Sequence, residues 1–262
     1  MKHPLVPGFS LIELGGEGPV RYLTLNNPTR HNAQTPAMWD ELTRAGAALR
    51  DEAEVKVLVV RGAGPSFSSG LDLGESTGDG FLARMASAPE SQSQGVVAEV
   101  EQFQRAFTWM REAPYISIAA VHGAAFGAGF QLALACDIRI VASDARLGLR
   151  EARLGVLPDL GATAVLPGLI GAERALDLVL TSREFSGDDA AAWGIALRAV
   201  PASRLEVEVE QYAGVLAVPS RTVLRYGKAA TYAPDMTTSF NIVAEGQVEC
   251  VRESFGSANS AP

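Results

Sequence analysis

Residues 116–136, which read ISIAAVHGAAFGAGFQLALAC, decide the fold class of this chain. Residues 116–121 form a short and mostly apolar run, which is typical of a buried strand. The glycines within residues 123–129 then allow the backbone to turn sharply, and residues 130–136 continue as an apolar helix. Free N–H groups at the start of such a helix can bind an anion or a developing oxyanion. The stretch therefore predicts a strand, a turn and a helix, with a candidate binding site at the turn.

A membrane-spanning helix is the alternative for this stretch, because no charged residue occurs between Tyr115 and Cys136. The glycines, His122 and Gln131 disfavour a span, and a buried strand followed by a buried helix fits the pattern better. The first residues also lack the sustained apolar segment of a secretory signal. We therefore expect a cytoplasmic protein that has no membrane partner.

Strands alternate with helices on both sides of this stretch. Short apolar runs predict further strands at residues 11–14, 20–25, 55–60 and 138–142. Thr35 is a predicted N-cap for a helix that ends near Arg50, and helical spacing recurs at residues 97–111. The intervening residues 77–94 are polar and rich in small side chains, which predicts a mobile segment. The last third is helical in pattern, with helices expected at residues 172–180, 188–193, 203–218, 221–232 and 236–254 and a frayed tail at 256–262.

This order predicts an α/β core over residues 1–197 and a C-terminal helical region over residues 198–262. The chain has 262 residues, of which 47% are hydrophobic and 20% are charged, so disorder is excluded as its main state. A net charge of −8 argues against nucleic acid as a partner. Two distant cysteines and three scattered histidines predict no disulfide framework and no metal site.

The glycine-rich turn does not fit the common nucleotide or hydrolase motifs. Leu132 stands where the third glycine of a dinucleotide-binding GxGxxG would follow Gly127 and Gly129. No Walker A lysine follows the glycines, and no GxSxG nucleophile elbow occurs in the chain. The spacing alone leaves two interpretations open, a binding turn or glycines that merely let a helix pack closely on a strand.

Five separated motifs together resemble the crotonase family, which is the enoyl-CoA hydratase/isomerase family. They are NNPTRHNA at residues 26–33, FSSGLDL at 67–73, GAAFGAGFQL at 123–132, CDIR at 136–139 and RLGVLP at 153–158. The resemblance runs from about residue 11 to residue 255. It implies a core of ββα turns wound into a superhelix, with a C-terminal helical region that supports homotrimers or hexamers built as dimers of trimers. It also implies an acyl-CoA thioester as substrate and no metal or redox cofactor.

The resemblance assigns two backbone N–H groups to an oxyanion hole for the thioester oxygen. They belong to Leu71 and to Ala128, where many members of the family carry glycine. A backbone donor survives that substitution, because alanine also has an N–H. The residues that the resemblance places around the substrate and CoA are Arg30, Ala33, Ser69, Leu71, Asp72, Leu73 and Gly127. Among them, Arg30 is a candidate for the CoA phosphates, and Asp72 is expected to satisfy loop amides.

Glu151 is the candidate base on the same resemblance. Hydratases of the family carry two glutamates 20 positions apart, and the matching residues here are Gln131 and Glu151. An amide cannot take or give a proton at neutral pH, so the glutamine weakens the expectation of efficient hydration. Gln131 is left with a role in orienting water or substrate.

Asp159 is a second candidate carboxylate, because some isomerases of the family place a catalytic aspartate at that offset from the glutamate. A helix N-cap is its alternative role. Two carboxylates beside an allylic system suit a proton shuttle. The favoured function is therefore double-bond isomerisation of an enoyl-CoA, with Glu151 as base. Enoyl-CoA hydration and non-catalytic acyl-CoA binding remain the alternatives.

Overall fold

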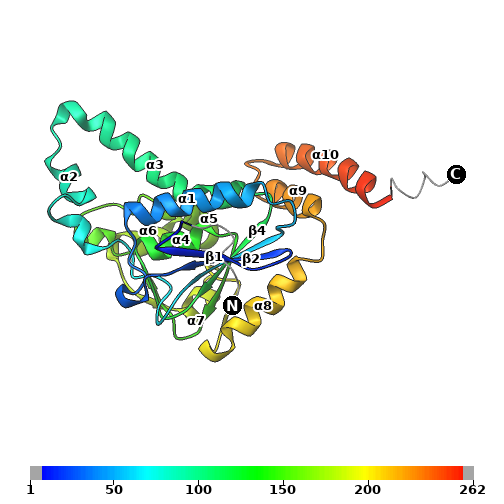
Figure 1. The fold of residues 1–262 in the computed structure, drawn as a ribbon, viewed down its shortest axis with the longest axis horizontal. Helices are drawn as coiled ribbons and strands as arrows, with labels where there is room; N and C mark the ends of the chain where they lie inside the picture. Colours follow the sequence, from blue (N-terminus) through cyan, green and yellow to red (C-terminus); the bar gives the residue numbers. More distant parts are fainter. Residues whose placement is uncertain (1–7, 256–262) are drawn as a thin grey trace.

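A six-stranded sheet is the base of the core in the computed structural model, which describes residues 8–255 (Figure 1). Its strand order is β1-β2-β3-β4-β6-β9. The bounds are β1 Ile12–Gly15, β2 Val20–Leu25, β3 Val57–Gly62, β4 Ile116–Val121, β6 Ile138–Ala142 and β9 Arg198–Val200. Only the β1–β2 pair is antiparallel, and the central strands β3 and β4 are almost wholly buried. Burial on both faces explains why these strands show as continuous apolar runs in the sequence.

A second sheet of three short strands lies next to the main one. It comprises β5 Ala124–Phe126, β7 Arg146–Gly148 and β8 Phe185–Ser186, with β7 in the middle. The turn expected at residues 123–129 is therefore a strand followed directly by helix α4, Ala128–Ala135. Strands of two or three residues are too short to show a periodic pattern, which is why the sequence did not predict this sheet.

Helices α1, Pro36–Arg50, and α3, Ser93–Glu112, pack against each other over the sheet (Figure 1). The predicted N-cap of α1 is confirmed, because the Thr35 hydroxyl accepts a hydrogen bond from the Met38 N–H at 3.3 Å. Residues 77–94, expected from the sequence to form a mobile segment, have regular structure over part of their length. That segment contains helix α2, Phe81–Ser87, and the start of α3, and the ring of Phe81 packs edge-on against Phe103 at 4.7 Å.

The remaining core helices follow the sheets. They are α5 Ala162–Ile170, which the sequence did not predict, and α6 Ala172–Thr181, α7 Gly187–Ala192 and α8 Leu205–Leu216, which lie close to their expected positions. Segment 198–262 is not helical throughout, because β9 pairs with β6 and adds a strand to the main sheet. Helix α8 also packs on that sheet. The expected tail at residues 256–262 lies outside the described residues.

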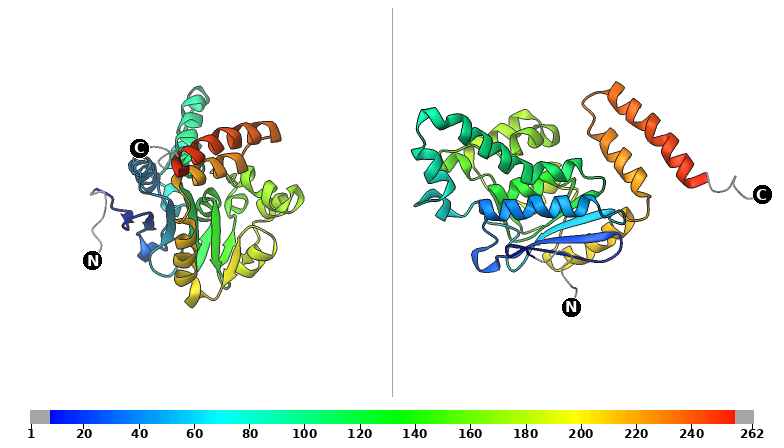
Figure 2. Two further views of the ribbon diagram at one scale, coloured as in Figure 1. Left: turned by 90° about the vertical axis from the view of Figure 1, so that its right-hand side faces the viewer. Right: turned by 45° about the horizontal axis from the view of Figure 1, so that its top comes forward.

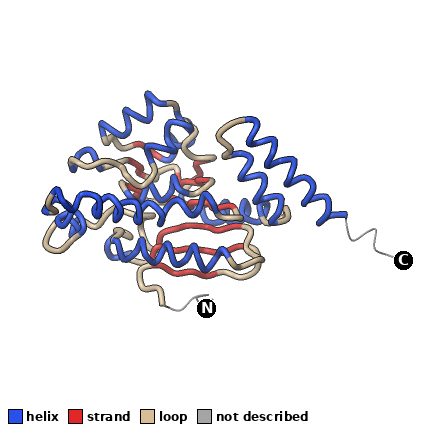
Figure 3. Tube along the Cα trace, turned by 90° about the horizontal axis from the view of Figure 1, so that it is seen from above, coloured by secondary structure: helices blue, strands red, loops and turns tan. Residues whose placement is uncertain are grey.

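The last two helices form a hairpin that extends away from the core (Figure 2). They are α9 Arg221–Thr231 and α10 Met236–Phe255. Figure 3 shows the same hairpin beside the sheet-containing part of the chain. No helix among residues 8–255 is long and apolar enough to cross a membrane.

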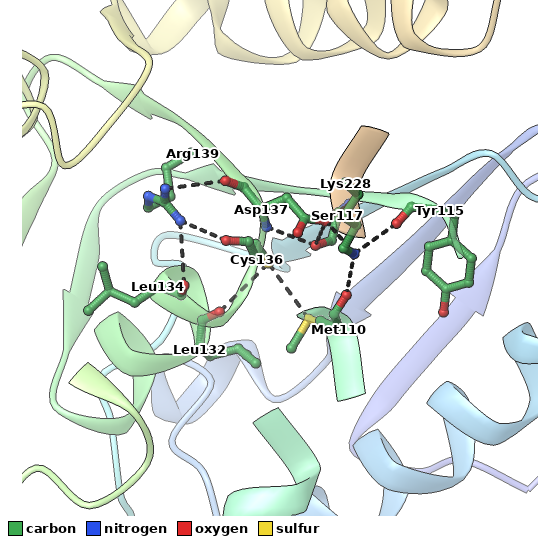
Figure 4. Close-up of polar contacts among 9 residues, drawn as sticks. All are labelled: Met110, Tyr115, Ser117, Leu132, Leu134, Cys136, Asp137, Arg139 and Lys228. Carbon is green, nitrogen blue, oxygen red and sulfur yellow. Dashed lines mark hydrogen bonds and ion pairs between the residues drawn. The ribbon is translucent and has the colours of Figure 1, made fainter. Parts of the chain in front are cut away.

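One buried ion pair fastens this hairpin to the core (Figure 4). The Lys228 ammonium of α9 donates to the Asp137 carboxylate at 2.8 Å and to the carbonyl oxygens of Met110 and Tyr115 at 2.6 and 2.9 Å. Asp137 also accepts from the Ser117 N–H at 2.7 Å. Both charged side chains are less than 10% exposed, at 3% and 6%. The buried ammonium of Lys228 thus has three acceptors in the core, whereas Oδ1 of Asp137 is buried without a hydrogen-bond partner.

Candidate active site

A single cavity of about 860 Å³ collects the residues that the sequence placed at the substrate. Its wall includes Arg30, Ala33, Ser69, Leu71, Asp72, Leu73, Gly127, Ala128, Gln131, Glu151 and Asp159. They come from four segments: the turn after β2, the loop after β3, the junction of β5 and α4, and the loop after β7. A volume of this size is in the range of small-molecule sites.

The loop after β3 and the β5–α4 junction approach each other closely, because the Ser68 N–H donates to the Ala124 oxygen at 2.9 Å and the Phe126 N–H to the Ser68 oxygen at 3.0 Å. Gly70 makes this approach possible. Its φ is +93°, and a Cβ on it would lie 2.5 Å from the Phe126 oxygen. Only glycine fits such a position without a backbone shift.

Leu71 and Ala128, whose N–H groups are the candidate oxyanion donors, both line this cavity. Within residues 8–255, neither N–H donates to another group of the protein. Ala128 is the first residue of α4, where a backbone N–H has no partner inside the helix. A Cβ on Gly70 would lie 3.5 Å from the Ala128 nitrogen, so the two donors stand on neighbouring walls. Two free donors facing one cavity suit the binding of a developing oxyanion.

The Leu71 loop is held by Gln34, a residue that the sequence analysis did not single out. The Gln34 N–H donates to the Gly70 oxygen, and the Asp72 N–H donates to the Gln34 oxygen, both at 2.8 Å. Its buried side chain accepts from the Trp39 indole at 2.8 Å and donates to the Ser68 hydroxyl at 3.2 Å. The only signal in the sequence is a polar residue directly before the helix-starting Thr35.

Glu151 is a buried carboxylate whose two oxygens are each held by an N–H donor. Oε1 accepts from the Gln131 amide at 2.9 Å, and Oε2 accepts from the Arg150 backbone N–H at 2.7 Å. Burial raises the pKa of Glu151 above its ordinary value, these hydrogen bonds oppose that rise, and the charge of Asp159 adds to it. A carboxylate with a raised pKa is suited to exchange a carbon-bound proton.

The amide of Gln131 is fixed in one orientation. Its oxygen accepts from the N–H groups of Leu160 and Ala162 at 2.9 and 3.2 Å, so its NH₂ group must point toward Glu151. The side chain is 1% exposed and has no freedom to turn. Gln131 therefore orients the carboxylate of Glu151 and supplies no proton of its own.

Asp159 lies on the wall of the same cavity as Glu151, with an exposed side chain. Desolvation of its carboxyl raises the pKa of Asp159. The alternative N-cap role is wrong, because Gly161 is the N-cap of α5 and no side chain caps that helix. Two carboxylates with raised pKa values thus share one cavity.

Arg30 and Asp72 form an ion pair at the cavity, with 2.9 Å between Nη2 and Oδ1. Asp72 also accepts from the Gly74 N–H at 2.9 Å, so it satisfies a loop amide as expected. The Arg30 side chain is 61% exposed. His31 lies 3.0 Å from the Ser66 hydroxyl, and His122 lies 2.9 Å from the Gly64 oxygen.

Several cavity residues were not predicted. Arg150 and Arg153 line the cavity, although the Arg150 guanidinium contacts Glu184 and the Phe126 ring, and Trp39, Phe81, Leu82, Met85 and Val100 form an apolar wall. The two arginines flank Glu151 in the sequence, which is a usable signal. The apolar wall comes from α1, α2 and α3, and helical periodicity cannot separate a cavity wall from a core face.

Comparison with known proteins agrees with this geometry. The family model described as enoyl-CoA hydratase/isomerase matches residues 15–241. A peroxisomal Delta(3,5)-Delta(2,4)-dienoyl-CoA isomerase of Arabidopsis thaliana is 31% identical over 185 residues, which are 71% of this chain and 66% of that protein. A crotonyl-CoA hydratase of Syntrophomonas wolfei is 32% identical over 220 residues, which are 84% of this chain and 80% of that protein.

Comparison with solved structures also finds a protein that binds a CoA thioester. The crystal structure of a Thermobifida fusca protein in complex with acetoacetyl-CoA superposes with a TM-score of 0.83 and 36% identity, covering 93% of this chain and 95% of that one. The match over residues 15–241 includes every candidate catalytic residue named above. The chain therefore belongs to the enoyl-CoA hydratase/isomerase family of enzymes, the crotonase family.

Proposed function

We propose that this enzyme shifts a double bond in an enoyl-CoA thioester, with Glu151 as the base. The observation that carries the proposal is the pairing of carboxylates in the cavity. Glu151 and Asp159 line the same cavity, whereas Gln131 is locked as an amide that can take no part in proton transfer. Hydration needs one group to activate water and a second to protonate carbon, while isomerisation needs only that a proton leave one carbon and reach another.

The proton shuttle is balanced as follows. Glu151 takes a proton from C2 of a 3-enoyl thioester, and the electron pair of the C–H bond moves to the thioester oxygen. The N–H groups of Leu71 and Ala128 hold the negative charge on that oxygen. The double bond moves to C2–C3 as the charge returns and C4 accepts a proton. That proton comes either from Glu151, which is then ionised again, or from a protonated Asp159, in which case a proton must pass from Glu151 to Asp159 before the next turnover. The proposed chemistry involves no net redox change and no metal, so chelator treatment is expected to leave turnover unchanged.

Turnover of matched substrates tests this proposal. Purified protein is expected to convert 3-enoyl-CoA to 2-enoyl-CoA, and Glu151→Gln is expected to lose that activity while still binding CoA thioester. Hydration of crotonyl-CoA at about 10 s⁻¹ or faster contradicts the preference for isomerisation. Binding without turnover of any thioester would instead support a non-catalytic acyl-CoA binder.

Hydration is the second candidate function, and the similarity to a crotonyl-CoA hydratase favours it. In that case Glu151 alone would activate a water molecule and return its proton to C2. The complex of the Thermobifida fusca protein with acetoacetyl-CoA supports an acyl-CoA thioester as the substrate class for either reaction.

We also propose that the α9–α10 hairpin is the contact region of a homotrimer or of a hexamer built from two trimers. Helix α10 exposes large apolar side chains along its length, namely Met236, Phe240, Val243, Val248, Val251 and Phe255. Exposed apolar surface of this extent is typical of a protein interface. The free cysteines Cys136 and Cys250 are compatible with a reducing compartment, and we propose the cytoplasm.

A further inference from the structure

Arg150 joins the ends of all three strands of the small sheet. It follows β7 by two residues, and its guanidinium forms an ion pair with Glu184, the residue directly before β8. The same guanidinium carbon lies 4.1 Å from the ring centre of Phe126, the last residue of β5. One side chain thus contacts β5 and the segment leading into β8 from the loop after β7.

These strand ends carry two parts of the active site. Phe126 is followed by Gly127 and by Ala128, whose N–H belongs to the proposed oxyanion hole. Arg150 is followed by Glu151, and the Arg150 backbone N–H donates to Glu151 Oε2 at 2.7 Å. The side chain of Arg150 therefore ties the segment that carries the base to the segment that carries an oxyanion donor.

The partner of Arg150 is well held itself. Glu184 Oε2 accepts from Nε and Nη2 of Arg146 at 2.9 and 2.6 Å. Desolvation works to raise the pKa of Glu184, but the hydrogen bonds and charges of Arg146 and Arg150 outweigh it and keep that pKa below its ordinary value. Glu184 is consequently ionised at neutral pH and available to both arginines.

We propose that Arg150, held by Glu184 and Phe126, is a positioning residue that fixes Glu151 relative to the Ala128 N–H. This role rests on the proposed function, because it requires Glu151 to be the base. Displacement of a reacting group by about 1 Å can lower a rate by about 10²-fold, so a side chain that sets this spacing affects catalysis without touching the substrate. A planar guanidinium can pair with a carboxylate and stack on a ring at once, which lysine cannot reproduce.

Two variants test the role, and a third is the matched control. Arg150→Met keeps the apolar stem and the backbone N–H but loses the ion pair and the charged stacking contact. Its kcat is expected to fall about tenfold with KM almost unchanged. The acid limb of its pH–rate profile should move to higher pH, because a weaker hydrogen bond to the ionised form raises the pKa of Glu151. Glu184→Gln, at an exposed position, should change kcat and the acid limb in the same direction by less.

Arg146→Gln is the control, since Arg146 pairs with the same carboxylate and its guanidinium carbon lies 5.6 Å from the centre of the same Phe126 ring, but it does not adjoin Glu151. Its kcat and acid limb should match the unmodified protein, and Arg150→Lys should restore only part of the lost rate. Unchanged kcat and acid limb in both Arg150→Met and Glu184→Gln would overturn the proposal. So would a higher KM with unchanged kcat, because that result makes Arg150 a CoA-binding residue.

Glu151→Gln, measured alongside, separates this proposal from the function on which it rests. Full activity of Glu151→Gln means that the proposed base is wrong, whatever Arg150 does. An inactive Glu151→Gln together with unmodified behaviour of Arg150→Met and Glu184→Gln rejects the positioning role alone. Melting curves of all the variants establish that each is folded in the assay.

Discussion

At the scale of single residues, the proposed preference for isomerisation rests on Gln131. Its amide oxygen is held by two backbone N–H groups of the 160–162 segment, so its nitrogen can only donate toward Glu151. A glutamate at this position would keep the same two backbone contacts. Its second oxygen would then lie about where the amide nitrogen lies, 2.9 Å from Glu151 Oε1. Two carboxyl groups at that distance must share a proton.

Gln131→Glu is therefore expected to gain hydration activity. The shared proton provides an acid at position 131, where the unmodified protein has only an amide, and we expect crotonyl-CoA hydration to rise about tenfold or more. Gln131→Met is the matched control, because it fills similar space without a titratable group. Equal hydration rates for Gln131→Glu and Gln131→Met, measured with the same crotonyl-CoA stock, would show that residue 131 does not limit hydration.

The pH dependence of isomerisation follows from the environment of Glu151. Burial penalises the charged form and raises the pKa of this carboxyl. A base works only when it is ionised, so activity should be full above that raised pKa and be lost as the pH falls through it. We expect the acid limb of kcat/KM above the ordinary glutamate value of about 4.3. A profile flat down to that value would contradict the role of Glu151.

At the scale of elements, the longer segments could be predicted from the sequence and the short ones could not. Strands β2, β4 and β6 match the expected residues 20–25, 116–121 and 138–142, because buried parallel strands leave unbroken apolar runs. The three strands of the small sheet have two or three residues each and left no pattern.

The candidate residues of the active site could be predicted from the sequence, but the contacts that orient them could not. The backbone N–H groups and carboxylates were placed in one cavity by motifs that are local in sequence. The contacts that orient them were not predictable, because they join distant segments. Gln131 with residues 160–162 and Arg150 with Glu184 are such pairs, and sequence spacing carries no information on them.

Helix α9 depends on the buried pair of Lys228 and Asp137. Burial lowers the pKa of Lys228, and the nearby carboxylate opposes that change. Lys228→Met would leave Asp137 as a buried, uncompensated charge, and we expect unfolding to become easier by about 3–5 kcal/mol. Arg225→Met is the control on the same helix, because its pair with Glu249 is nearly half exposed and should contribute less than about 1 kcal/mol. Urea unfolding of both variants measures the difference, and equal losses would contradict this account.

At the scale of the whole molecule, the apolar face of α10 explains part of the high hydrophobic content of the chain. Helix α10 packs mainly against α9, and Phe240 on its apolar face is 65% exposed. Phe240→Glu places a charge in the proposed subunit contact and should convert the oligomer to smaller species. Sedimentation velocity of the variant and of the unmodified protein measures their oligomeric states. Thr237→Glu, on the same helix, is the control. A monomeric unmodified protein would rule out the proposed trimer.

The relative rates of isomerisation and hydration test whether this enzyme is an isomerase with Glu151 as its base. The unmodified protein is given 3-enoyl-CoA and crotonyl-CoA in parallel, and kcat/KM is measured for isomerisation and for hydration. With a single buried base and a locked amide in place of a second acid, isomerisation should be faster by at least about 10²-fold, and Glu151→Gln should abolish it. Hydration faster than isomerisation, or isomerisation that survives in Glu151→Gln, would contradict the account.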